Sequence, residues 1–101
     1  MVDRNLYTGL IRLHILHHAA EGPIFGQAMI DELGRHGYRL SAGTLYPILH
    51  GMERQGYLRS RVTIDGGRNR RVYRATPAGR KALVTARTRV QELFGEMFEH
   101  D

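Results

Sequence analysis

The sequence of 101 residues contains no cysteine and no tryptophan. Without cysteine the chain has no disulfide, no thiolate nucleophile and no cysteine-based zinc site, so thiol redox chemistry is excluded. No apolar run approaches the ~20 residues that a membrane-spanning helix needs, and no basic stretch followed by an apolar signal segment opens the chain. We therefore expect a cytoplasmic protein without a membrane partner, and the length and apolar content of 42% predict one compact domain.

Motifs of catalysis are also lacking. No phosphate-binding glycine loop joins a strand to a helix, and no pair of carboxylates is set by its spacing. The adjacent glycines Gly66 and Gly67 fall instead between two segments with strand-like patterns. The sequence therefore predicts a binding protein without a cofactor, and not an enzyme.

Positive charge is abundant and unevenly spread. The formal net charge is +5, and Lys81 is the only lysine among the 15 cationic residues. Between Arg54 and Arg74 the only acid is Asp65, whereas residues 90–101 carry acids and no lysine or arginine. Arginine has a planar fork that suits phosphate groups, so the basic middle of the chain favours a nucleic-acid partner. The arginines of this basic segment are Arg54, Arg59, Arg61, Arg68, Arg70, Arg71 and Arg74.

Apolar periodicity predicts two helices in the first third of the chain. Residues 5–20 carry apolar side chains at helical spacing, and the segment 21–23, with its glycine and proline, ends this helix. Ile24 and Phe25 form a short extended piece. A second helix spans residues 26–35 and is expected to turn three side chains inward, which are Ala28, Met29 and Leu33.

A third helix is predicted to begin after Ser41, whose hydroxyl would accept a hydrogen bond from a first-turn N–H. Its apolar residues recur at i, i+3, i+4 and i+7 and form a buried stripe of Leu45, Ile48, Leu49 and Met52. Proline inside this pattern removes one backbone hydrogen bond and should loosen the first turns. The opposite face, which a partner would meet, carries Gly43, Tyr46, Pro47, His50 and Arg54.

A β-hairpin follows the third helix. Residues 57–64 alternate as a half-buried strand does, with Leu58, Val62 and Ile64 on the buried side, and residues 70–75 form the return strand. Between them lie Asp65, Gly66 and Gly67, which tolerate the positive φ angles of a tight turn.

A long last helix opens at Thr76, which reads as an N-cap followed by proline at the first helical position. Its apolar residues step by three and four, as in the seam of a coiled coil, and two phenylalanines widen this seam. A single small domain leaves such a seam unpaired, so we expect dimerisation through the last helix, assisted by the first. The expected dimerisation residues are Leu6, Leu10, Leu83, Ala86, Val90, Leu93, Phe94, Met97 and Phe98.

The chain resembles the PadR family of bacterial transcriptional regulators, in particular its short subgroup with one C-terminal helix. The order of three helices, a hairpin and a long helix is that of a winged helix-turn-helix with a helix appended. The motifs that carry the resemblance are Ser41-x-Gly43-Thr44-Leu45-Tyr46-Pro47-x-Leu49, Glu53-x-x-Gly56-Tyr57-Leu58 and Tyr73-Arg74-Ala75-Thr76-x-x-Gly79.

The resemblance implies a mainly α fold with a small hairpin, in which a winged DNA-binding domain spans residues 1–76 and a dimerisation helix spans residues 77–101. It implies a homodimer that binds a palindromic operator in double-stranded DNA and represses transcription until a small-molecule effector releases it. A cavity between the first and last helices could hold such an effector, lined by Leu10, His14, Val90, Phe94 and Met97.

We expect DNA contact from the third helix and from the hairpin tip, whose side chains reach bases and phosphates in such scaffolds. Alternatively, Tyr46 packs against the hairpin, and the arginines only keep the hairpin solvated. A winged adaptor that docks on another protein through its last helix is the alternative function. The expected DNA-binding residues are Ser41, Gly43, Thr44, Tyr46, Pro47, His50, Arg54, Gly66, Gly67, Arg68, Arg70 and Arg71.

Three histidines, His14, His17 and His18, crowd one segment of the first helix. His14 and His18 lie one turn apart, as zinc ligands can, but no third ligand of suitable type is evident, so we expect no metal site. If they face a dimer interface, these histidines would make stability depend on pH between about 5 and 8.

Overall fold

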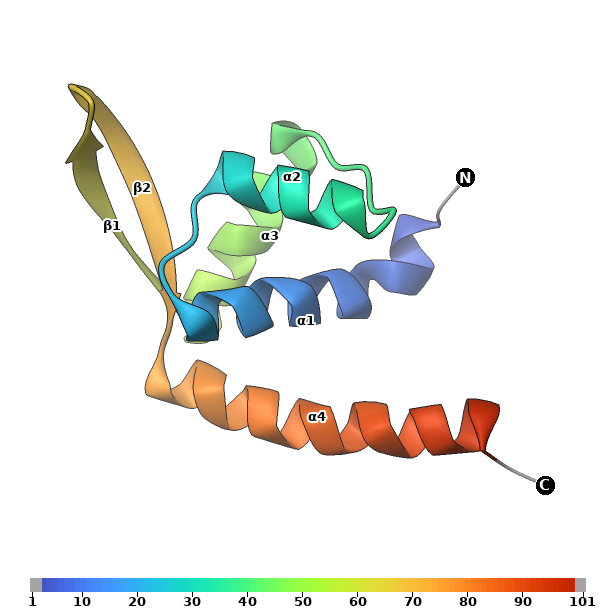
Figure 1. Ribbon diagram of the computed structural model, residues 1–101. Coiled ribbons are helices and arrows are strands. Elements are labelled where there is room, and N and C mark those ends of the chain that lie inside the picture. Colours follow the sequence, from blue (N-terminus) through green and yellow to red (C-terminus); the bar gives the residue numbers. More distant parts are fainter. Residues whose placement is uncertain (1–2, 100–101) are drawn as a thin grey trace.

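The structure is a computed structural model that describes residues 3–99 of the chain, so Asp101 of the acidic tail lies outside the described residues. Three helices form a compact unit, a two-stranded hairpin projects from one side of it, and the last helix starts at the base of the hairpin and runs beneath the first helix (Figure 1). This arrangement confirms the predicted fold class. The elements are α1 (Arg4–Glu21), α2 (Gly26–Arg35), α3 (Ala42–Arg54), β1 (Leu58–Asp65), β2 (Arg68–Ala75) and α4 (Pro77–Phe98).

The core lies where α1, α2 and α3 meet the base of the hairpin. The predicted stripe of α3 is buried or half-buried, as expected. Ala28 is exposed, so its predicted inward position is wrong. The inward residues of α2 follow i, i+3, i+4 and i+7 from Gly26, a series that leaves Ala28 on the outer side. The fully buried large side chains are Ile11, Ile15, Leu33, Leu45, Leu49, Met52, Leu58 and Tyr73.

The hairpin pairs from Leu58 opposite Ala75 to Asp65 opposite Arg68. Gly66 and Gly67 have φ angles of 59° and 79°, which confirms the tight turn predicted at this point. The predicted burial of Val62 and Ile64 is wrong, because the exposed fraction of the surface is 52% for Val62 and 77% for Ile64. The hairpin extends beyond the helices, so only its base has a core to pack against (Figure 1).

The extended piece predicted after α1 makes a third, one-residue strand beside the hairpin. The N–H of Ile24 donates to the carbonyl of Tyr73 at 2.9 Å, and the N–H of Tyr73 donates to the carbonyl of Ile24 at 2.7 Å. The α1–α2 connection is thereby bonded to the outer edge of β2, and the hairpin is fixed to the helical unit.

Helix starts are partly as predicted. Thr76 caps α4, accepting from the N–H of Gly79 at 2.9 Å, with proline at the first position. Ser41 precedes α3, but its hydroxyl makes no cap bond and lies 3.4 Å from the hydroxyl of Thr44, so that detail was wrong. The helix α3 continues through Pro47 to Arg54. Among residues 3–99 no helix is long and apolar enough to cross a membrane.

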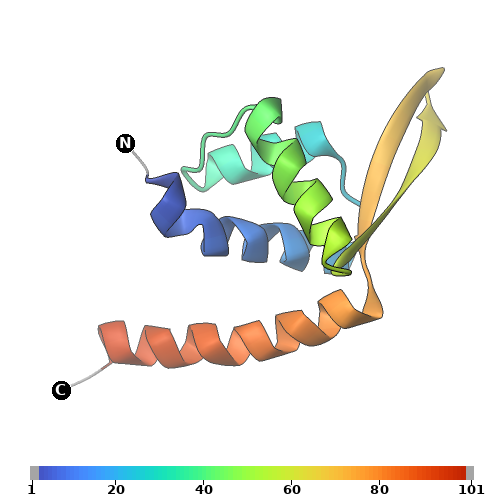
Figure 2. The same cartoon turned by 180° about the vertical axis from the view of Figure 1, so that it is seen from behind.

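The helix α4 runs antiparallel to α1, and the first half of α4 contacts α1 (Figures 1 and 2). The contact depends on Gly79, which is buried. A methyl group at this position would collide with the carbonyl of Tyr57 and press on Leu16. The absence of a side chain at Gly79 therefore lets α4 lie against Tyr57, in the connection from α3 to β1, and against α1.

We predict that Gly79→Ala lowers the free energy of unfolding by about 1–3 kcal/mol, because the added methyl must displace backbone. Gly34→Ala is the matched control on α2, where nothing lies within 4 Å of the added carbon. It should leave stability unchanged or raise it by up to about 1 kcal/mol. Urea unfolding at one protein concentration measures both, and equal effects of the two substitutions would contradict the role given to Gly79.

Candidate nucleic-acid interface

The outer face of α3 is polar and accessible. Tyr46 is 36% exposed, and His50 and Arg54 are exposed further along the helix. The rings of Tyr46 and His50 are 6.2 Å apart and tilted, so the two side chains form one continuous surface. Ser41, Gly43 and Pro47 are exposed and Thr44 is half-buried near the start of the helix. The structure thus brings the predicted residues of α3 together on one face.

Tyr46 also has a structural contact, which is with the start of α2. The Tyr46 ring and hydroxyl lie so close to Gly26, the first residue of α2, that a methyl group there would overlap them. One side of the ring therefore packs on α2, while the rest is open to solvent. This contact fixes the direction of the side chain before any partner arrives.

A polar network joins the end of α3 to the hairpin. The Glu53 carboxylate accepts from the N–H of Ser60 at 3.1 Å and from its hydroxyl at 2.8 Å. The guanidinium of Arg71 donates to the same hydroxyl at 3.0 Å. Sequence reasoning missed Glu53 and Ser60 as site residues, although Glu53 stands in one of the motifs quoted above. Burial and the nearby Glu53 carboxylate raise the pKa of Tyr73, which lies opposite Ser60 in the hairpin.

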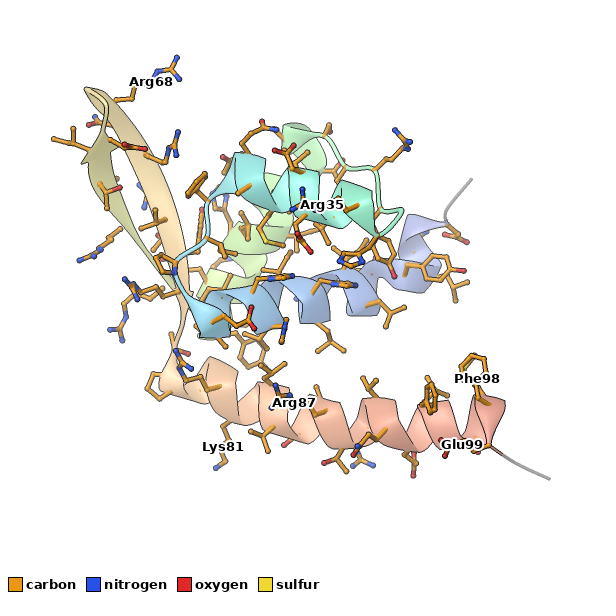
Figure 3. All side chains as sticks on the ribbon, in the orientation of Figure 1. Arg35, Arg68, Lys81, Arg87, Phe98 and Glu99 are labelled. Atoms are coloured by element: carbon orange, nitrogen blue, oxygen red, sulfur yellow. The ribbon has the colours of Figure 1, made fainter. Side chains whose placement is uncertain are left out.

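The arginines near the hairpin tip differ in their freedom. The guanidinium of Arg70 lies 4.3 Å above the ring of Phe25, and its Nη1 is 3.2 Å from Oδ2 of Asp65. Arg70 is therefore tied to the start of α2 as well as to the other strand. Arg68 is exposed and extends from the tip beside Gly66 and Gly67 (Figure 3).

Further arginines lie at the hairpin base, on the face opposite to Tyr73 and Arg71. Arg59 and Arg74 are direct partners across the two strands, and with Arg61 they line an open hollow of about 380 Å³. Like charges placed opposite each other destabilise a sheet, so this pairing costs stability unless an anion lies nearby. Sequence reasoning counted these residues in the basic segment but did not include them in the site. Only the strand register could reveal their proximity.

A separate apolar surface runs along α4 and α1. Phe94 and Phe98 lie side by side with ring centres 5.1 Å apart, at the far end of α4 from the hairpin. Leu83 and Ala86 are half-buried against α1. The remaining residues of the predicted dimerisation set are all more than 40% exposed, and these are Leu6, Leu10, Val90, Leu93, Phe94, Met97 and Phe98.

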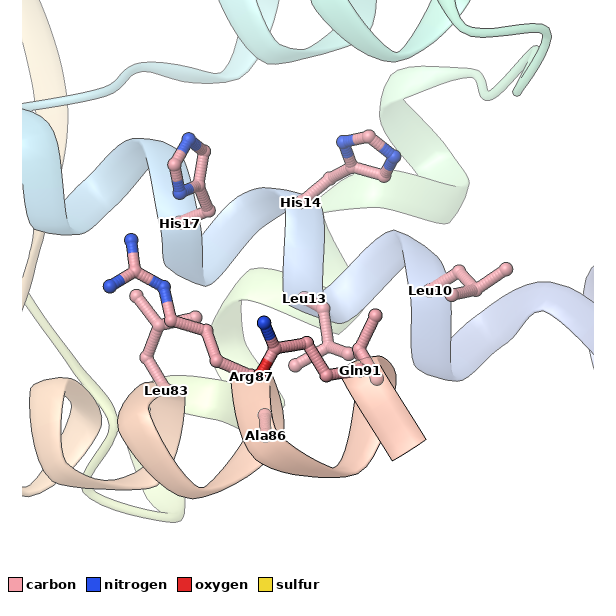
Figure 4. Close-up of a pocket in the computed structure, with 9 residues that line it drawn as sticks. Leu10, Leu13, His14, His17, Leu83, Ala86, Arg87 and Gln91 are labelled. Carbon is pink, nitrogen blue, oxygen red and sulfur yellow. The ribbon is translucent and has the colours of Figure 1, made fainter. Parts of the chain in front are cut away.

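The predicted cavity between α1 and α4 is an open groove of about 570 Å³ (Figure 4). Leu10, His14 and Val90 contribute to its lining, as expected. Phe94 and Met97 do not, because they lie further along α4, where the two helices no longer enclose a space. The imidazoles of His14 and His17 point away from α4 in this view.

Two histidines of α1, His14 and His18, contact side chains of α2. His14 stacks on His36 of α2 with ring centres 4.8 Å apart, and burial, followed by the nearby His36, lowers the pKa of His14. Hydrogen bonds from Arg35 and His36 lower the pKa of Glu32 to about 2. Glu21 lies beside a different pair, His17 and His18, and His14 is not part of that group.

The arrangement of α2 and α3 with an adjoining basic hairpin defines a winged helix-turn-helix protein. Residues 15–85 match the model of the PadR-like family of transcriptional regulators. The chain is 52% identical over 94 residues to the transcriptional regulator Rv3488 of Mycobacterium tuberculosis, covering 93% of this chain and 88% of the relative. The chain therefore belongs to the PadR-like family and is a transcriptional regulator.

Solved structures agree with this assignment. A PadR family regulator from Eggerthella lenta is 30% identical and superposes with a TM-score of 0.78 over 96% of this chain and 88% of that one. The protein smu.1704 from Streptococcus mutans is 28% identical, with a TM-score of 0.77 over 85% of this chain and 80% of that one. The helices, the hairpin and the long last helix are thus those of a known regulator fold.

We predict that Glu53→Gln and Ser60→Ala are coupled by about 1 kcal/mol or more in a double-mutant cycle of unfolding free energies, because both substitutions act on the same hydrogen bond, from the Ser60 hydroxyl to the Glu53 carboxylate. Thr63→Val serves as the control partner, since the Thr63 hydroxyl bonds to the carbonyl of Arg70 and not to Glu53. Its effect should add to that of Glu53→Gln within about 0.3–0.5 kcal/mol. If the effects of Glu53→Gln and Ser60→Ala are additive, the two side chains do not stabilise the fold through a shared network.

Proposed function

We propose that this regulator is a repressor that binds double-stranded DNA in a sequence-specific manner. The observation that carries the proposal is the joint exposure of the polar face of α3 and the arginines of the adjoining hairpin. The helix α3 ends at the base of the hairpin, so both elements can contact one duplex at the same time (Figure 2). A DNA partner also supports the expected cytoplasmic location.

In this proposal α3 enters the major groove. The hydroxyls of Ser41, Thr44 and Tyr46 bind phosphates, and Gly43 and Pro47 let the backbone approach the duplex closely. His50 and Arg54 reach base edges or the backbone from the following turns. The contact of Tyr46 with Gly26 supports this role, because a side chain held in advance loses less entropy on binding.

In this proposal the hairpin binds the DNA next to the segment that α3 contacts. Gly66 and Gly67 give the tip a narrow profile, and Arg68 enters or borders the minor groove. Arg71, held by Ser60, binds the backbone nearer to α3. Arg70 contributes less than Arg68, because its charge is already offset by Asp65.

We further propose a homodimer in which residues 77–101 act as the dimerisation arm of a DNA-binding domain formed by residues 1–76. The exposed apolar residues of α4 continue beyond its contact with α1, and a second α4 would cover them. Such a dimer would present two α3 helices to successive major grooves, about 34–36 Å apart. A small-molecule effector bound in the groove between α1 and α4 would alter this spacing and release the DNA.

The alternative is an adaptor that uses α4 to dock on a different protein. The exposed apolar surface of α4 favours it equally, but the arginines of the hairpin have no role in it. Salt discriminates the two functions, because only a partner with many phosphates releases many counterions.

We predict that Arg68→Ala weakens binding to cognate and random duplexes by the same factor and lowers the slope of log affinity against log salt by about 1, because one phosphate contact is lost. Lys81→Ala removes the same charge from the outer side of α4 and is the control, with an unchanged slope (Figure 3). Fluorescence anisotropy over a salt series measures both. A loss of sequence discrimination at constant salt slope would contradict this role of Arg68.

We predict that Phe94→Asp converts the dimer to a monomer and abolishes tight operator binding, because a carboxylate would be buried without a partner in the α4 interface. Val84→Asp is the control, since Val84 is 63% exposed on the same helix but outside the seam. Light scattering gives the mass of each variant. If Phe94→Asp remains a dimer, the interface lies elsewhere.

A further inference from the structure

We propose that the C-terminal end of α1 carries a binding site for a divalent transition-metal ion of the zinc class, with His17, His18 and Glu21 as ligands. The Nε2 atom of His17 is 3.5 Å from Oε2 of Glu21, and the Nδ1 atom of His18 is 3.7 Å from Oε1 of Glu21. One ligand atom from each of the three residues lies within 4.8 Å of the others.

These separations fit a metal better than they fit hydrogen bonds. A hydrogen bond between nitrogen and oxygen spans about 2.7–3.2 Å, which is shorter than both distances to Glu21. Bonds of about 2.1 Å to a tetrahedral zinc ion place neighbouring ligand atoms about 3.4 Å apart. Both distances to Glu21 are near this value and all three ligand atoms lie within 4.8 Å of one another, so rotation of the side chains would bring them around an ion.

The Glu32 carboxylate on α2 lies beside the ring nitrogen of His18 that does not face Glu21. This nitrogen, Nε2, is 3.5 Å from Oε2 of Glu32. A proton on Nε2 would face this carboxylate and leave the lone pair of Nδ1 directed to the ion, which is the usual arrangement of a metal-bound histidine. Glu32 is itself held by Arg35 and by His36, whose Nε2 is 2.9 Å from Oε2.

The surroundings favour a cation in two further ways. Glu21 is the last residue of α1, where the unpaired carbonyls of the helix concentrate negative potential. The Glu32 carboxylate, with 23% of its side chain exposed, adds a second negative charge beside His18. His14 is not a ligand in this arrangement, because it stacks on His36.

The ligand set indicates the class of ion and the type of site. Two imidazoles and one carboxylate suit zinc and its neighbours, whereas calcium and magnesium prefer oxygen ligands alone. Three protein ligands leave a fourth position to water, and the side chains of Glu21 and His17 are 64% and 43% exposed. The ion would therefore exchange with solution, unlike one in a closed structural site.

The test is isothermal titration calorimetry of the tag-free protein with Zn²⁺. A second titration with Co²⁺ records the visible absorption of a tetrahedral complex. The wild type should bind one ion per chain. His18→Gln and Glu21→Gln should abolish the absorption and weaken binding by more than the roughly 10- to 100-fold expected for Glu32→Gln, which removes only the supporting carboxylate.

The matched control is His50→Gln, which removes a histidine from α3 and should leave the affinity for Zn²⁺ unchanged. Circular dichroism of each variant verifies that the helices are intact. The proposal is overturned if the wild type shows no saturable binding, or if His18→Gln and Glu21→Gln bind Zn²⁺ as the wild type does. The titration contains no DNA, so its outcome is independent of the proposed function.

Discussion

The structure depends on one pair of facing residues in the hairpin, Ser60 on β1 and Tyr73 on β2. Tyr73 is fully buried and exchanges two backbone hydrogen bonds with Ile24, which ties β2 to the connection between α1 and α2. Ser60, the partner of Tyr73 on β1, donates a hydrogen bond to Glu53 near the end of α3. The direction in which the hairpin leaves the core is therefore fixed relative to both helices. Towards its tip the hairpin extends away from the helices, and Arg68 is exposed there.

The sequence predicted most of this architecture because its signals are local. Helical periodicity located α2 at its observed bounds, and the glycine pair located the turn of the hairpin. Errors arose where the answer depends on how far the core extends. Val62 follows the alternation of a half-buried strand but lies outside the core, and Ala28 lies beside the inward stripe of α2 rather than on it.

The candidate site was predictable in its position but not in its contacts. Helical geometry alone brings Tyr46, His50 and Arg54 to one face of α3. By contrast, the contact of Tyr46 with Gly26 and the tie between Arg70 and Phe25 join residues that are distant in sequence. Such contacts follow from the packing of α2 against α3 and the hairpin, which no spacing rule describes. Together they hold in advance the side chains through which we propose that the protein reads DNA.

Selection from a pool of random duplexes would show whether a dimer of this chain recognises a specific DNA sequence. We expect enrichment of a palindrome whose half-site centres are about 10 base pairs apart. Binding to this palindrome should exceed binding to random DNA by about 10³-fold or more and fall steeply with salt. Failure to enrich any sequence, with weak binding that is indifferent to salt, would contradict the account.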